Sequence, residues 1–569
     1  MQLAFTFAEY RALVRRFAAR LPALLVQHPA TAELAVQVER LDIEGTLEGR
    51  FSVAVVGQMR AGKSTLLNAL MGQDLAPTGV NETTATINWF RHGRGEQTGV
   101  FRVNWRDGTA TDVPIGEITA WLGKGEAAQR TRWLDFFADS PFLAGANLID
   151  TPGTRSVLAS HEGAVRGFVL DDAATAPGEQ AATDGTGQKA DAILYVVNPV
   201  AKESDADLLA MFDEKTRMAG AHLHNSIAVV QKWEHLGDDP LAEAERKCAR
   251  IADQLAGKVA QVLPTSGLLG RCTQRLSVAE FWQPLADIAH ATSASDLSLL
   301  LEGPEFFADS DDLFDDMRIP QARRVALAKL APWPVVRLSV REAARLRLAS
   351  GEALRQRIWH CSGLEQLQRA LHERFFRQAE LIKANTVLRR AWQPCNVALG
   401  RLHGLEQQQA RELARAKDLA TRLGQAQEGE PAILPEVRRF VATAEATTAA
   451  FLASVHKLRR DLDDLREEAR RNFEALDGDL AALERAANDL DLPATDKVWL
   501  LSVFGAHGLE VAERLGLPAT APTAQWIATA ESLLERCQDR AGPGAKGAWA
   551  YRLAGERLEH ILDLCEARA

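Results

Sequence analysis

Two hydrophobic patterns divide the chain. Between residues 51 and 270, short runs of apolar and β-branched residues alternate with stretches of helical pattern. This alternation predicts a mostly parallel sheet with helices on its faces. The predicted strands cover residues 51–56, 86–91, 100–105, 145–150, 192–198 and 226–231.

Elsewhere the apolar residues recur at steps of three and four, the period of an amphipathic helix. Before residue 51 this stripe includes Leu13, Val14 and Phe17, and after about residue 375 it dominates the chain. The stretches from 388 and from 451 both show the repeat of long packed helices. Gly and Pro residues between them predict an antiparallel helical hairpin with its turn near 428–435.

Two segments interrupt the sheet pattern. Residues 171–188 consist mostly of Asp, Ala, Thr, Gly, Pro and Gln without apolar periodicity, so we expect a surface insertion. Residues 271–361 show irregular helical patterns and are expected to form a helical insertion. Ser362 followed by Glu365 fits a capping box, which predicts that Ser362 is the N-cap of a long helix.

Charge and composition narrow the class of protein. The 569 residues exceed one compact core, and the net charge of −10 argues against binding nucleic acid through overall charge. The six cysteines show no zinc-ligand spacing. The N-terminus does not resemble a signal peptide, and no apolar run approaches the roughly 20 residues that span a bilayer. We therefore expect a cytoplasmic protein with no nucleic-acid partner, whose contact with a membrane is at most peripheral.

Residues 57–64 match the phosphate-binding motif GxxxxGK[ST], between an apolar run and a helical pattern. The glycines let backbone N–H groups approach phosphates, and a helix N-terminus favours anions. Lys63 is expected to reach the β- and γ-phosphates, and the Ser64 hydroxyl to ligate Mg²⁺. The predicted nucleotide contacts of this loop are Gly57, Gln58, Met59, Arg60, Ala61, Gly62, Lys63, Ser64 and Thr65.

Two further segments are suited to Mg²⁺ and the γ-phosphate. Asp150 ends a predicted strand and begins the sequence Asp-Thr-Pro-Gly. It is expected to hold Mg²⁺ through water, while the Gly153 amide senses the γ-phosphate. In the preceding loop Thr84 is the predicted Mg²⁺ ligand, with Thr83 as the alternative, because a threonine there orders the loop around the γ-phosphate. The predicted metal ligands are Ser64, Thr84 and, through water, Asp150.

The predicted base-reading segment follows the strand at 226–231. The sequence QKWE at 231–234 stands where guanine-binding proteins carry [NT]KxD. The Lys232 stem can lie along the base, and Glu234 can accept hydrogen bonds from guanine N1–H and N2–H₂. The first and last residues of this segment are one methylene longer than usual, which leaves guanine specificity open. Ser266 and Gly267 are expected to offer backbone contacts to the base.

Together these motifs resemble those of the dynamin superfamily, and in particular bacterial dynamin-like proteins. The resemblance rests on the P-loop and its helix, residues 77–84, the Asp-Thr-Pro-Gly sequence, and residues 362–376 ahead of the long helices. It implies a GTPase with Mg²⁺ as cofactor and GTP as substrate. It also implies a homodimer through the GTPase heads, or pairing with a second dynamin-like protein, and a role in membrane remodelling, peripheral to the inner membrane.

The resemblance also implies a division into domains. Residues 1–50 would be N-terminal helices that join a neck, and residues 51–375 a dynamin-type GTPase domain that includes both insertions. Residues 376–569 would form the rest of the helical neck and stalk. The predicted fold is thus an α/β P-loop GTPase domain plus a long α-helical hairpin.

One position departs from the family pattern. The second residue after the first P-loop glycine is Met59, where eukaryotic dynamins carry a catalytic glutamine, and a thioether cannot orient water. The neighbouring Gln58, and Arg60 acting as an internal arginine finger, are the two alternatives. With Lys63 and Thr84 they form the predicted catalytic set.

Two other functions stay open at this point. A nucleotide-gated scaffold or defence protein with little turnover would fit Met59 and the altered base segment. A regulatory GTPase of the ribosome or RNA type usually adds a compact basic domain, whereas this chain adds a helical hairpin to an acidic protein.

Overall fold

The structure is a computed structural model in which the chain divides into two compact units. The helical unit comprises Met1–Gly49 and Gln378–Ala569, and the sheet unit comprises Arg50–Asp184 and Lys189–Arg377. The structure describes residues 6–40, 43–57, 60–77, 86–121, 126–150, 190–198, 225–256, 258–309, 319–426, 433–542 and 544–566. The predicted insertion at 171–188 therefore lies outside the described residues.

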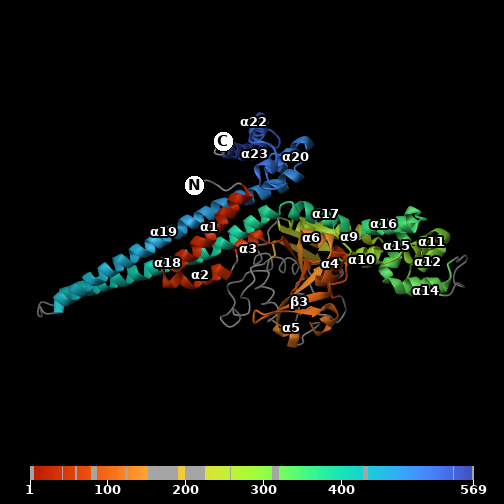
Figure 1. Cartoon of the computed structure of the whole chain (residues 1–569), viewed down its shortest axis with the longest axis horizontal. Coiled ribbons are helices and arrows are strands. Elements are labelled where there is room, and N and C mark those ends of the chain that lie inside the picture. Colours follow the sequence, from red (N-terminus) through yellow and green to blue (C-terminus); the bar gives the residue numbers. More distant parts are fainter. Residues whose placement is uncertain are drawn as a thin grey trace. The chain divides into compact units, whose positions relative to one another are not determined.

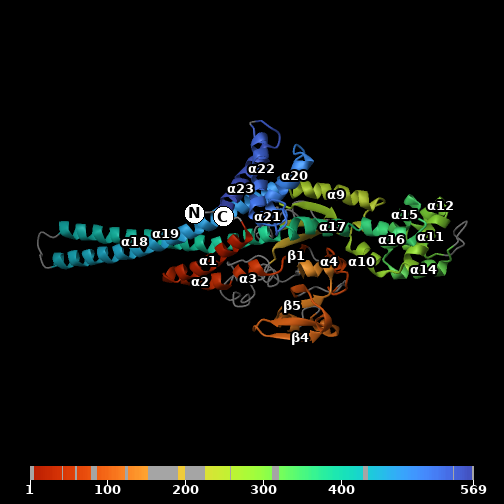
Figure 2. The same ribbon diagram turned by 45° about the horizontal axis from the view of Figure 1, so that its top comes forward.

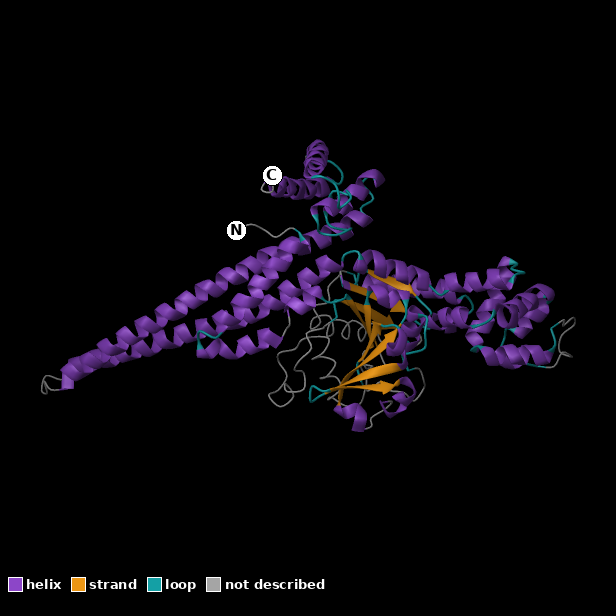
Figure 3. Cartoon of the chain, viewed as in Figure 1, coloured by secondary structure: helices purple, strands orange, loops and turns teal. Residues whose placement is uncertain are grey.

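Within the described residues, the sheet unit contains one nine-stranded sheet of order β4-β3-β5-β2-β6-β1-β7-β8-β9 (Figure 3). The neighbouring strands β6, β1, β7, β8 and β9 run parallel, which confirms the predicted mostly parallel core. The strands are β1 Ser52–Gly57, β2 Asn88–His92, β3 Val100–Trp105, β4 Ala110–Pro114, β5 Thr131–Ala138, β6 Asn147–Asp150, β7 Ala192–Val197, β8 Ser226–Val230 and β9 Gln261–Pro264.

The register of this sheet positions the candidate site. Val55 on β1 pairs with Asp150 on β6, and Gly57 pairs with Val196 on β7. Because β1, β6 and β7 are parallel, their carboxyl ends meet at one edge, where ligands of open α/β sheets bind. All six predicted strands are present within two residues of their expected bounds, whereas β4, β5 and β9 were not predicted.

Helices cover the sheet and extend beyond it. One apolar cluster joins Cys248 and Ile251 of α9 to Ala54 and Tyr195 on the sheet. The helices of the sheet unit are α4 Lys63–Met71, α5 Glu126–Arg130, α6 Pro141–Gly145, α9 Pro240–Gln254, α10 Gly267–Arg275, α11 Gln283–Ala291, α12 Ala294–Leu300, α13 Pro304–Phe307, α14 Gln321–Leu330, α15 Trp333–Leu346, α16 Gly351–Cys361 and α17 Leu364–Leu371.

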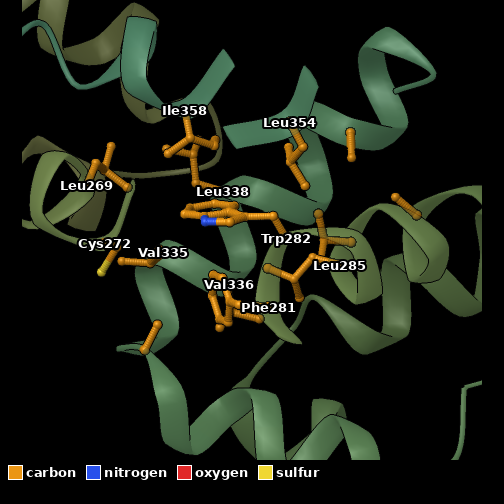
Figure 4. Packing of buried hydrophobic residues seen from close by; sticks show 14 of the residues in the cluster. Leu269, Cys272, Phe281, Trp282, Leu285, Val335, Val336, Leu338, Leu354 and Ile358 are labelled. Atoms are coloured by element: carbon orange, nitrogen blue, oxygen red, sulfur yellow. The ribbon is translucent and has the colours of Figure 1, made fainter. Parts of the chain in front are cut away.

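We call α11–α16 the helical module. Its helices gather away from the sheet, within the same unit (Figures 1 and 2). The fully buried Trp282 packs among Leu285, Val335 and Ile358 (Figure 4). The described residues of 271–361 thus form helices, and their apolar core also includes residues of α9 and α10, such as Ala244 and Leu269.

The helical unit contains two long helices, α18 of 48 residues and α19 of 56 residues. They lie side by side in both views (Figures 1 and 2), and they follow the predicted hairpin pattern. Arg401 of α18 contacts α2 by donating to Ala30 O at 3.0 Å and pairing with Glu33. The helices of this unit are α1 Phe7–Leu25, α2 Pro29–Arg40, α3 Ile43–Glu48, α18 Ala379–Ala426, α19 Ile433–Asn488, α20 Ala494–Val503, α21 Val511–Arg514, α22 Thr523–Arg540 and α23 Ala548–Glu566.

The predicted capping box at Ser362 is wrong. The N-cap of α17 is Gly363, in the left-handed region at φ 69°, and α17 has only 8 residues. Ser362 instead ends α16, where its hydroxyl donates to Trp359 O at 2.6 Å. The long helix starts at Ala379.

Candidate nucleotide-binding site

The phosphate loop joins β1 to α4. A Cβ on Gly57 would lie 2.4 Å from Val196 O, so β7 leaves no room for a side chain there. Gly62 caps α4 with φ 97°, a conformation that favours glycine. Arg60 also has a positive φ, of 63°, and its side chain is exposed. Such strain in a non-glycine residue is found most often at functional sites.

Lys63 folds back over this loop. Its ammonium Nζ donates to Gly57 O at 3.3 Å, and the side chain is buried. Burial lowers the pKa of Lys63, and the negative charge of Asp150 opposes that effect. A buried ammonium in the first turn of a helix, where backbone N–H groups favour anions, is suited to a phosphate.

Asp150 lies next to α4 and is fully buried. Ser64 Oγ donates to its Oδ2 at 3.3 Å, and within the described ranges Oδ1 has no hydrogen-bond partner. Burial raises the pKa of Asp150 to about 6, although Lys63 and Ser64 act in the opposite direction. A hydroxyl and a buried carboxylate with an unpaired oxygen form the hard oxygen set that Mg²⁺ prefers.

The predicted base segment lies against the phosphate loop. A Cβ on Gly62 would lie 3.6 Å from Gln231 Oε1 and 3.7 Å from Lys232 Cε. Gln231 is buried, and its Oε1 accepts a hydrogen bond from Gly267 N at 3.1 Å. Gln231 Nε2 has no partner among the residues that the structure describes. The side chain of Gln231 thus joins the two base-reading segments and keeps one donor group available.

Glu234 is the buried carboxylate of this segment. Burial raises its pKa, and its own backbone amide, Ser266, His235 and Lys232 oppose that rise. Its Oε2 has no hydrogen-bond partner in the described part of the chain. An unpaired acceptor in a buried position is what N–H groups of a purine base would satisfy.

The last base-contacting loop rests on α4. Ser266 is the N-cap of α10, and its Oγ accepts from Leu269 N at 3.1 Å. A Cβ on Gly267 would lie 2.9 Å from Leu66 N, so the loop needs glycine to pack against α4. The structure therefore brings 264–267 beside both the phosphate loop and the base segment.

Several predicted site residues are thus neighbours at one edge of the sheet: Gly57, Gly62, Lys63, Ser64, Asp150, Lys232, Glu234, Ser266 and Gly267. Ala61 is fully buried and Thr65 half-buried in the first turn of α4. Gln58, Met59, Thr83, Thr84 and Gly153 lie outside the described residues. The hydrogen bond by which Gln231 links residues 231–234 to Gly267 was not predicted from the sequence. The position of Gln231 at the start of the QKWE sequence could have indicated it.

This sheet, loop and helix define a P-loop nucleotide-binding domain. Residues 53–233 match the model of the Dynamin family. This match confirms the predicted resemblance to the dynamin family over this part of the sheet unit, and a large helical part accompanies that unit.

Parts of this chain are also similar to curated proteins. Isoniazid-induced protein IniC of Mycobacterium tuberculosis is 28% identical over 242 residues, which are 40% of this chain and 44% of that protein. Dynamin-like protein 2 of Campylobacter jejuni is 30% identical over 122 residues, covering 21% of this chain and 20% of its own. The bacterial dynamin-like protein of Nostoc punctiforme is 48% identical over 46 residues, 8% of this chain and 7% of its own. The matches thus span less than half the length of these relatives.

Among solved structures, one described as an oligomerised bacterial dynamin pair that senses and tethers membranes is similar over 96% of this chain and 79% of its own. The TM-score is 0.33 and the sequence identity 13%.

Proposed function

We propose that this protein is a dynamin-like GTPase that binds and hydrolyses GTP with Mg²⁺. The observation that carries the proposal is that Lys63, Ser64 and Asp150 lie together where β1 and β6 end. Glu234, whose Oε2 has no partner in the described residues, belongs to the segment that packs against the same loop. The first three residues have the chemistry of a Mg²⁺–phosphate site, and the fourth can accept from a base.

Lys63, Ser64 and Asp150 each have a role in this proposal. Lys63 would exchange its hydrogen bond to Gly57 O for the β- and γ-phosphates, so the free loop keeps the ammonium paired. Ser64 and Asp150 would hold the metal, directly and through water. Mg²⁺, when bound, supplies positive charge that neutralises the phosphates as the bond to the γ-phosphate breaks.

Hydrolysis would need a group that orients water or stabilises charge. Arg60 is exposed in a left-handed backbone conformation at the phosphate loop, as an internal arginine finger would be. Gln58 and Thr84 also belong to the proposed catalytic set, on the basis of the sequence, because both lie outside the described residues.

The proposal extends to assembly. Nucleotide binding would pair two GTPase heads, or one head with that of a second dynamin-like protein, and would be coupled to movement of the helical stalk in membrane remodelling. Within the described residues, no helix is long and apolar enough to cross a membrane. The proposed contact with a membrane is therefore peripheral, and co-sedimentation with anionic liposomes, with and without GTP, tests it.

Turnover of purified protein with GTP and with ATP tests the enzymatic proposal, with Lys63→Ala as the control. The proposal expects Mg²⁺-dependent GTP hydrolysis that is lost in the variant. Specific activity that rises with protein concentration would support head pairing. Binding of GTP without turnover would instead favour a nucleotide-gated scaffold, the function that Met59 keeps open.

A further inference from the structure

The base-reading segment is attached to the helical module through Trp233. This side chain follows Lys232 directly, yet it is 0% exposed and belongs to the apolar cluster that the module shares with α9 and α10 rather than to the cluster on the sheet. The same cluster contains the fully buried residues around Trp282 that Figure 4 shows. The residue directly before Glu234 is therefore fixed in this apolar core, which restricts the backbone from which the Glu234 side chain extends.

A second attachment lies four residues after Glu234. Asp238 is held by two arginines of α15: Arg337 Nη2 lies 3.1 Å from its Oδ1, and Arg341 Nη2 lies 3.5 Å from the same oxygen. Arg341 Nη1 also donates to the main-chain oxygen of Asp238 at 2.6 Å. The bond to the main chain fixes the backbone itself, which a surface ion pair alone would not do.

The other base-reading segment, 264–267, is attached to the end of the same module. Ser266 N donates to Ser362 O at 2.7 Å, directly after α16. Gly363 lies so close that a Cβ there would be 2.1 Å from Pro264 O. Leu364 packs against Gly270 of α10, where a Cβ would lie 1.9 Å from Leu364 Cδ1. These contacts leave the loop little freedom to move away from the end of α16.

We propose that the helical module sets the geometry of the base pocket, and that Trp233, Arg337 and Arg341 are positioning residues for Glu234. The inference rests on the proposed binding of a guanine nucleotide. Both walls of that pocket are fixed to one packed body, so their separation is set by the module. Because packed interiors resist deformation, a shift of α15 would be transmitted to Glu234. The phosphate loop joins β1 to α4, so α15 contributes no residue to it.

The test compares ligands with and without a base. The Arg337→Ala/Arg341→Ala double variant removes two partly buried side chains that are not members of the apolar cluster. We expect GDP to bind about tenfold more weakly, while pyrophosphate, used as a competitor, binds as it does to the wild type. With GTP, KM should rise and kcat should stay constant, because the base is bound equally in the ground and transition states. Trp233→Phe, which leaves a cavity at the root of the segment, should show the same selective loss.

Arg345→Ala is the matched control. Arg345 lies on α15 one turn after Arg341, but its bidentate bonds of 2.9 and 2.8 Å go to Glu342 of the same helix. It should change neither affinity. Replacement by Arg337→Lys/Arg341→Lys keeps donors to Asp238 and should recover part of the GDP affinity.

Three results would overturn the inference. Unchanged GDP binding in the double variant would show that α15 does not position Glu234. Equal weakening of GDP and pyrophosphate would show a general disturbance of the sheet unit. A fall in kcat without a change in KM would place the effect on catalysis. Failure of the wild-type protein to bind GDP is a separate result, since it removes the proposed function itself.

Discussion

Ser64 Oγ donates a hydrogen bond to Asp150 Oδ2 across 3.3 Å, although the two residues are 86 positions apart in the chain. The parallel pairing of β1 with β6 makes this contact, because it ends both strands at the same edge. The contact links the P-loop helix to a carboxylate that is fully buried. Such a carboxylate costs stability when ionised, unless a cation neutralises it.

Asp150→Asn should therefore separate stability from function. Burial raises the pKa of Asp150 from 3.8 to about 6, so the folded protein binds this proton more tightly than the unfolded chain. Its contribution to stability is present at low pH and is lost as the pH rises through about 6. At pH 7 the nucleotide-free variant should be more stable than the wild type, by on the order of 2 kcal/mol, and should have lost Mg²⁺-dependent nucleotide affinity.

Denaturant unfolding between pH 4 and 8, without nucleotide, measures this difference. Asp139→Asn, at an exposed carboxylate of the same unit, is the control and should change neither property. A variant that is less stable than the wild type at pH 7 would contradict the account of Asp150.

Gly57→Ala should distort the phosphate loop. The new methyl group would meet Val196 O at 2.4 Å, and backbone of a neighbouring strand cannot move aside cheaply. We expect a loss of about 2 kcal/mol in the protection of β1 and β7 amides, measured by hydrogen exchange, and loss of nucleotide binding. Gly116→Ala has open space around its new methyl group and should leave both unchanged. Normal nucleotide binding by Gly57→Ala would contradict the described packing of the loop.

Asp479→Asn should destabilise the helical unit. Asp479 of α19 is buried between Arg514 Nη1, at 3.1 Å, and Arg557 Nε, at 2.8 Å. Burial and Asp479 both raise the pKa of the adjacent Tyr10 in α1, so the carboxylate lies where α1, α19, α21 and α23 meet. Its loss leaves the fully buried guanidinium of Arg514 without its counter-charge, at a cost of about 3–5 kcal/mol.

Hydrogen exchange in α1 and α23 is the measurement. Asp463→Asn, on the same helix, removes only an exposed pair with Arg466 and should cost about 0.5 kcal/mol or less. Similar exchange in both variants would show that the buried network has no special role.

The position of the candidate phosphate loop between β1 and α4 was predictable because its information is local. Residues 57–64 lie between a strand and a helix, and Asp150 ends a second strand, so the spacing of both motifs was enough. The hairpin was predictable for a similar reason, since its heptad-like repeat extends over most of α18 and α19. Both predictions needed only neighbours along the chain.

The features that sequence reasoning missed depend on distant partners. β5 carries the charged Asp135 at a buried position, where Arg91 Nε and Asn104 Nδ2 of the neighbouring strands donate to it at 2.6 and 2.8 Å and Trp133 Nε1 of β5 donates at 3.1 Å. Ser362 was expected to start a helix, but close packing on Pro264 O requires the next residue, Gly363, as the cap. Arg91 and Asn104 are far from Asp135 in the sequence, and Pro264 is far from Gly363, so no local pattern announces these contacts.

The most direct test of the central claim is the base preference of Glu234→Gln. A carboxylate accepts from guanine N1–H and N2–H₂, whereas a glutamine amide accepts from N1–H and donates to the oxygen that replaces N2 in xanthine. The wild type should prefer GTP over XTP by about 100-fold, and the variant should prefer XTP. Glu245→Gln, at an exposed position of α9, should keep the wild-type preference. A variant that still prefers GTP, or a wild type that binds ATP as well as GTP, would contradict the assignment of this site to a guanine nucleotide.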